Sequence, residues 1–61
     1  MTVYELCSLY IESGEVMTIY SMEKNETVFR GTFAQAMFSE YYSDEEVGSF
    51  GIEDGIICIN I

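Results

Sequence analysis

The chain has 61 residues, and eleven Asp and Glu residues against two Lys and Arg residues give a formal charge of −9, with no histidine. Because 49% of the residues are hydrophobic, the composition excludes an acidic disordered tail and predicts one folded domain, residues 1–61. The charge disfavours bare nucleic acid and anionic membrane as direct partners and favours a basic protein surface.

The first predicted element is a helix over residues 2–12. Thr2 and Glu5 have the spacing of a capping box, in which each side chain accepts a hydrogen bond from the other residue's backbone N–H. Gly14 is suited to the left-handed conformation that follows many helices. An apolar face at the helical spacing i, i+3, i+4 and i+7 is formed by Val3, Leu6, Cys7 and Tyr10.

A β-hairpin is predicted over residues 15–31. β-Branched and aromatic residues occur on both sides of a turn at Lys24-Asn25, and this composition favours strands. Gly31 is expected to end the second strand of the hairpin.

A second helix is predicted over residues 32–42, where Thr32 and Gln35 repeat the capping-box spacing. Its C-terminal end is expected to meet the acidic residues 44–46. That contact is unfavourable because the C-terminus of a helix carries partial negative charge. The apolar stripe predicted for this helix consists of Phe33, Ala34, Met37, Phe38 and Tyr41.

Two further strands are predicted over residues 47–52 and 56–61, with a tight turn at Asp54-Gly55. The last strand contains no charged side chain, so it must be central in the sheet, covered on both faces or paired with another chain. Alternation places Ile57, Ile59 and Ile61 on one face, and Ile56 and Cys58 on the other.

These elements predict an α+β fold with two layers, in which two short helices cover one face of a four-stranded, mostly antiparallel sheet in the chain order α-β-β-α-β-β. The second face of the sheet then needs a partner. We expect a homodimer formed through that face, through an edge strand, or through the side of the first helix that carries Tyr4 and Ile11. With no leader pattern at the start, we expect a cytoplasmic protein whose Cys7 and Cys58 are free buried thiols.

The residue content argues against catalysis. No histidine or cationic neighbour is available to activate Cys7 or Cys58, and a chain of this length can hardly build alone the deep cleft that paired carboxylates need. Glu40 and residues 44–46 form a dense oxygen cluster, but they lack the ligand alternation of a calcium loop, so a solvated acidic turn is favoured. We expect no enzyme activity, no metal site and no cofactor.

The strongest candidate for partner binding is segment 40–46, which interleaves tyrosines with carboxylates, and the hairpin tip at 53–54 could extend its negative field. Tyrosine is enriched at interfaces, and carboxylates accept paired hydrogen bonds from arginine. The alternative is a solvated loop in which Tyr41 belongs to the core. The predicted partner-binding residues are Glu40, Tyr41, Tyr42, Asp44, Glu45, Glu46, Glu53 and Asp54.

Three stretches carry a resemblance, namely residues 2–6, 28–32 and 47–56. In their helix cap, hairpin and glycine break, they resemble small acidic proteins common in phages and mobile elements of Gram-positive bacteria, most of them uncharacterised. The resemblance implies a tiny, cytoplasmic, phage-related protein without enzyme activity. It assigns no functional residues.

Three functions are therefore considered. The preferred one is an inhibitor that docks on a basic, nucleic-acid-binding surface of a host or defence protein. The second is an oligomeric binding module, or sponge, for a small signalling ligand, held by Arg30 and by the backbone near Gly48 and Gly51, which mark either tight packing or close approach of a partner. The third is a structural or accessory homodimer whose charge serves solubility.

Overall fold

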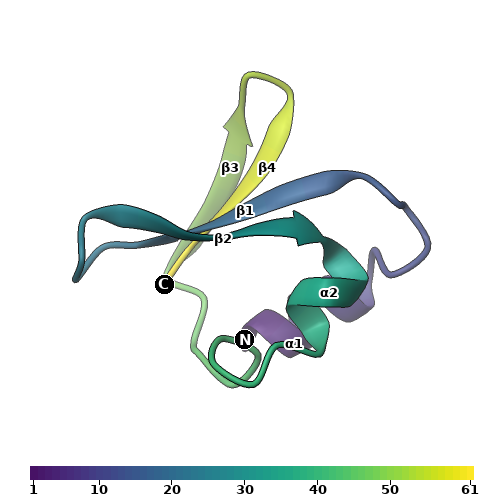
Figure 1. Cartoon of the computed structure of the whole chain (residues 1–61), viewed down its shortest axis with the longest axis horizontal. Helices are drawn as coiled ribbons and strands as arrows, with labels where there is room; N and C mark the ends of the chain where they lie inside the picture. Colours follow the sequence, from purple (N-terminus) through teal and green to yellow (C-terminus); the bar gives the residue numbers. More distant parts are fainter.

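The computed structural model describes residues 1–61 and contains two helices and four strands. Figure 1 shows them in the predicted chain order, and the α+β class is confirmed. The elements are α1 (Val3–Ser8), β1 (Val16–Ser21), β2 (Glu26–Thr32), α2 (Phe33–Met37), β3 (Ser49–Glu53) and β4 (Ile56–Asn60).

The four strands form one sheet in the order β2-β1-β4-β3. Two antiparallel hairpins, β1–β2 and β3–β4, are joined by parallel pairing between β1 and β4. The uncharged last strand is therefore central, which was one of its predicted places. Asp54 and Gly55 form the β3–β4 turn with φ values of +55° and +79°, the left-handed conformation that this tight hairpin turn requires.

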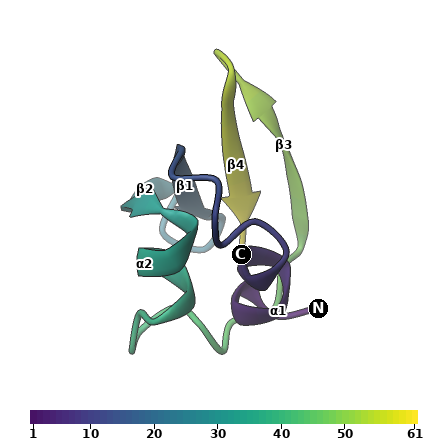
Figure 2. The ribbon, with the colours of Figure 1, turned by 90° about the vertical axis from the view of Figure 1, so that its right-hand side faces the viewer.

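Both helices lie on the same side of the sheet (Figures 1 and 2). Their apolar side chains meet those of the two central strands in a small core. The ring of Tyr10 lies 5.2 Å from that of Phe33 and extends the packing at the edge of this core. The buried core residues are Val3, Leu6, Cys7, Met17, Ile19, Phe33, Ala36 and Ile59.

Alternate residues of the central strands point to opposite faces, as the two-residue period of a strand requires. On the helix side, Ile59 is buried while Ile57 and Ile61 pack against the core. On the opposite side, Ile56 and Cys58 are half-buried. The two predicted sets are confirmed, and the side of the sheet that faces away from the helices is called the open face below.

The prediction that Gly31 ends the second strand was wrong, because Gly31 lies inside β2 and pairs with Met17. Glycine fits at this position because neighbouring side chains leave no room for a Cβ atom. A Cβ atom at this position would lie 2.5 Å from Oε1 of Gln35 and 3.1 Å from the ring of Phe29. Gln35 uses that space to accept a hydrogen bond from the Thr32 backbone N–H at 2.9 Å, so the strand can pass directly into the capping box of α2.

Both helices begin where the capping boxes predict, but both are shorter than predicted. α1 ends at Ser8 and not at residue 12, and α2 ends at Met37 and not at residue 42. The apolar side chains that directly follow these ends are not buried, since Leu9 is 67% exposed and Phe38 is 70% exposed. The predicted conflict between the C-terminus of α2 and residues 44–46 does not occur, because the helix ends well before them.

Candidate partner-binding surfaces

Segment 38–46 leaves α2 as a series of turns and carries most of the predicted partner-binding residues. Tyr41 is 81% exposed, so its placement in the stripe of α2 and the alternative that it is a core residue were both wrong. Tyr42 instead packs against the core, with its ring edge-on to Phe29 at 6.4 Å. The solvent-exposed members of this set are Glu40, Tyr41, Asp44, Glu45 and Glu46.

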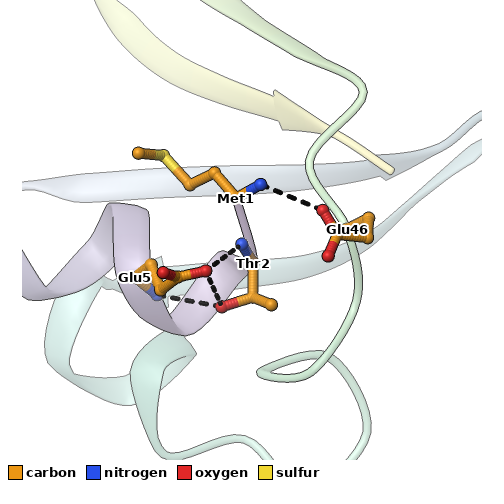
Figure 3. Close-up of polar contacts among 4 residues, drawn as sticks. All are labelled: Met1, Thr2, Glu5 and Glu46. Atoms are coloured by element: carbon orange, nitrogen blue, oxygen red, sulfur yellow. Dashed lines mark hydrogen bonds and ion pairs between the residues drawn. The ribbon is translucent and has the colours of Figure 1, made fainter.

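The start of α1 holds this segment in place. The first backbone N–H groups of a helix have no partner within the helix. Here the N–H of Val3 donates to the carbonyl of Glu45, and that of Tyr4 donates to the carbonyl of Ser43, both at 2.9 Å. The Met1 amino group donates to the Glu46 carboxylate at 3.0 Å, and this contact raises the pKa of the amino group (Figure 3). The acidic segment is therefore anchored through its backbone, while most of its carboxylates face solvent.

Glu53 and Asp54 lie at the tip of the β3–β4 hairpin. Figures 1 and 2 place this tip at the opposite end of the molecule from segment 38–46. The structure thus separates the predicted partner-binding residues into two acidic surfaces and does not bring them together. The two surfaces are called the acidic segment (residues 40–46) and the acidic tip (residues 53–54) below.

Almost none of the negative charge is neutralised within the chain. Of the eleven carboxylate side chains, only that of Glu46 forms an ion pair, and its partner is the Met1 amino group. Lys24 and Arg30 form no ion pair, and no cationic side chain follows Arg30 in the sequence. Both acidic surfaces are consequently free to attract an external cation.

The open face carries a hollow of about 450 Å³ over strands β1 and β4. Its hydroxyl and amide groups come from the central strands β1 and β4 and from Thr27 of β2, its carboxylates come from the acidic tip, and its apolar lining includes Ile56. Only the acidic tip was predicted, because finding the rest requires knowing that β1 and β4 pair in parallel. The hollow is lined by Thr18, Tyr20, Thr27, Glu53, Asp54, Ile56, Cys58 and Asn60.

The residues predicted for the alternative ligand site do not line this hollow. Strand register places Arg30 opposite Thr18 and Gly51 opposite Cys58, so both lie beside the hollow at either end of one row across the sheet. Gly48 lies just before β3, where its N–H donates to the Asn60 carbonyl at 2.8 Å and a Cβ atom would be 3.0 Å from Cε of Met22. The three residues therefore form no common site.

A third surface, which the sequence reasoning missed, is the outer strand β3. Phe50 is 57% exposed and Ile52 is 75% exposed. The alternation of Ser49, Phe50, Gly51, Ile52 and Glu53 was the available signal, because it places both apolar residues on one face of a strand.

The two cysteines differ in their burial. Burial raises the pKa of the Cys7 thiol, which lowers the fraction of reactive thiolate. Cys58 is half-buried in the wall of the hollow, and both cysteines are free. No group of three or more His, Cys, Asp or Glu side chains is arranged to hold a metal ion. Neither helix has the length and apolar character needed to cross a membrane.

Comparison of the chain with protein-family models, with curated proteins and with solved structures found no match. The resemblance to small acidic proteins of phages and mobile elements stays a prediction.

Proposed function

We propose that the protein acts by binding, and that it docks on a basic surface of another protein, where it inhibits nucleic-acid binding by occupying the site of the phosphates. The observation that carries this proposal is the net charge of −9. Of the carboxylate side chains, only that of Glu46 is paired within the chain. A small body with this charge is attracted rapidly to a positive surface and is repelled by nucleic acid itself.

The acidic segment supplies suitable chemistry for such docking. Its exposed carboxylates at Glu40, Asp44 and Glu45 can accept paired hydrogen bonds from arginine. Tyr41 adds an exposed ring beside them, with an apolar face and a hydroxyl group. Because the backbone of residues 43–47 is hydrogen-bonded to residues 1–4, Asp44 and Glu45 are presented with little loss of chain entropy on binding.

The proposal is tested by native mass spectrometry and pull-down from the cells that express the protein, followed by competition with nucleic acid for the captured protein. Affinity is then measured for an Asp44→Lys/Glu45→Lys variant and for a Glu15→Lys/Glu23→Lys control with the same net charge. We expect at least about a tenfold loss for the first variant and a smaller loss for the control, because charges at the contact matter most. Circular dichroism checks that both variants remain folded.

An affinity that barely changes between low and high ionic strength would contradict the proposal, since contacts between exposed charges are screened by salt. A captured protein that still binds nucleic acid in the presence of saturating inhibitor would also contradict it.

The hollow on the open face supports a second candidate, a binding module for a small ligand, with one site per protomer of an oligomer. The carboxylates of Glu53 and Asp54 at this hollow favour a cationic or neutral hydrogen-bonding ligand over a phosphate. In the same mass spectra, an oligomer that retains a small extra mass favours this candidate. A bare homodimer favours the third function, an accessory protein without a ligand.

A further inference from the structure

We propose that β3 binds an extended segment of the basic partner by strand addition, so that the segment continues the sheet beyond β3. This proposal rests on the proposed function, because it assigns a place and a conformation to part of the basic partner. The occupant is a protein segment in which basic and apolar residues alternate.

The first support is that β3 is an unprotected edge. It is the outermost strand, it pairs only with β4, and all five of its residues are exposed. An edge strand leaves alternate backbone N–H and C=O groups unpaired, and proteins commonly block such edges with Lys, Pro, a bulge or a covering element. Ser49–Glu53 contains no Lys, Pro or bulge, and its one charged side chain, Glu53, stands at the end of the strand. Figure 2 shows the β3–β4 hairpin extending clear of both helices.

The opposite edge of the sheet shows how this chain protects a strand. β2 contains an irregularity in its pairing with β1, where Val28 has no partner, and it carries the cation Arg30. It also runs directly into α2 at Thr32. The contrast between the two edges indicates that β3 is the edge available for another chain.

The side chains of β3 supply an apolar contact surface. Phe50 pairs with Ile59, and Ile52 pairs with Ile57, so both side chains lie on the helix side of the sheet. Their partners Ile59 and Ile57 are buried and half-buried, whereas Phe50 and Ile52 are 57% and 75% exposed. An added strand would place its own apolar residues beside Phe50 and Ile52, as cross-strand neighbours.

Charge selects the occupant. Glu53 ends the strand and Asp54 follows it, and no cationic side chain occurs anywhere after Arg30. A second copy of this chain would bring the same carboxylates and another charge of −9 to the edge. A segment that alternates Lys or Arg with Val or Ile instead places its cations on the face of Glu53 and its apolar residues on the face of Phe50 and Ile52. Gly51 has open space around it and does not obstruct this approach.

The probe is a short fluorescent peptide that alternates Lys and Val, titrated with the full chain by fluorescence anisotropy. Its control has the same sequence with alternate backbone amides N-methylated, which removes the donors needed for strand pairing. We expect the methylated peptide to bind at least about tenfold more weakly, because main-chain hydrogen bonds provide much of the affinity in strand addition. Amide NMR shifts on titration should concentrate in Ser49–Glu53.

Two variants separate the edge from general charge attraction. Ile52→Lys places a cation on the edge strand, and Phe38→Lys makes a matched change at a side chain of similar exposure, 70% against 75%, outside β3. We expect Ile52→Lys to weaken peptide binding at least about tenfold, and Phe38→Lys to change it less than about threefold, because only the first blocks the edge.

Equal weakening by both variants, equal binding of the two peptides, or no binding of the Lys-Val peptide would overturn the strand-addition proposal. So would a β3-mediated dimer of the free chain in sedimentation that Ile52→Lys dissociates. If Ile52→Lys still binds the captured basic partner in a salt-sensitive manner, the proposed function stands and only strand addition is lost. If the wild type binds no basic protein, the proposed function is lost as well.

Discussion

Gly31 shows how the absence of one side chain allows two elements to meet. It belongs to β2, yet the space above it is filled by the side chain of Gln35 from the first turn of α2. The chain can therefore turn from strand to helix with no intervening loop. A sequence pattern identifies the glycine but not the neighbour for which it leaves room.

Replacing Gly31 by Ala is expected to lower the free energy of unfolding. The new Cβ would lie 2.5 Å from Oε1 of Gln35, so the capping bond must break or the ring of Phe29 must shift. We expect a loss of about 1–2 kcal/mol, measured by urea denaturation, because a lost helix cap typically costs about that much. Gly51→Ala is the matched control, since its Cβ meets nothing within 4 Å. It should be neutral or stabilising by up to about 1 kcal/mol, and an equal loss in both variants would contradict this account.

Tyr41 and Tyr42 show what sequence reasoning could not resolve at this scale. Extending the helical period beyond Met37 predicts burial of Tyr41. The helix ends at Met37, however, so Tyr41 is exposed and Tyr42 packs against the core. A helix end that shifts by a few residues changes which neighbour faces the core.

At the scale of elements, the two helices depend on their caps. Helices this short do not form alone in water, because nucleation is costly and few hydrogen bonds follow. Both have a complete capping box, in which Thr2 pairs with Glu5 and Thr32 pairs with Gln35. The two boxes differ in that only Glu5 carries a charge. The Thr2 backbone N–H donates to the Glu5 carboxylate at 2.9 Å, and the Thr2 hydroxyl donates to the same carboxylate. These two hydrogen bonds, the backbone one more strongly, lower the pKa of Glu5 below the ordinary value of 4.5.

This difference predicts a pH dependence. Because the folded state lowers the pKa of Glu5, the charged carboxylate stabilises the fold above pH 4.5, and that stability is lost as the pH falls through the lower folded-state value. Glu5→Gln should therefore be less stable than the wild type at pH 7, and the difference should shrink as the pH falls below 4.5. Urea denaturation over a series of pH values measures it.

Gln35→Glu is the reciprocal variant. It places a carboxylate in the first turn of α2, where the helix N-terminus favours negative charge, so it should gain stability at pH 7 and lose that gain in acid. A stability difference between Glu5→Gln and the wild type that stays constant with pH would contradict the role given to the Glu5 charge.

The local signals in the sequence predicted the elements well, and the long-range contacts were beyond them. The capping boxes, the hairpin within residues 15–31 and the Asp54-Gly55 turn depend on neighbours in sequence, and the structure contains all of them. The ends of the helices and the parallel pairing of β1 with β4 depend on contacts between distant residues. For the same reason the acidic residues were identified but their division between two ends of the molecule was not.

At the scale of the whole molecule, repulsion among the negative charges destabilises a fold that only a small core stabilises. Only eight hydrophobic residues are buried, while the net charge is −9. Charges of one sign on a compact body destabilise it, because unfolding moves them apart. The energy that holds the fold together is therefore sensitive to the ions around it.

Adding salt is expected to stabilise the protein. Raising NaCl from about 0.02 to about 0.5 M shortens the screening length to a few ångströms, so most of the repulsion is removed. We expect a gain of about 1 kcal/mol in the free energy of unfolding, or roughly 4–8 °C in Tm for a domain of this size, measured by circular dichroism. A variant with Gln at Glu12, Glu15 and Glu23 should start more stable and gain less. A Tm that stays constant or falls with salt would contradict the expectation.

The strand order also fixes when this molecule can fold. β4 lies between β1 and β3, so the hairpin synthesised first has no partner sheet until the strand synthesised last is present. Met17 must find Ile57 across most of the chain, and such distant pairings make folding slow because loop closure must come first. During translation, the β1–β2 hairpin and both helices therefore wait without a complete core, and the nascent chain becomes a folded protein only after residues 56–60 have left the ribosome.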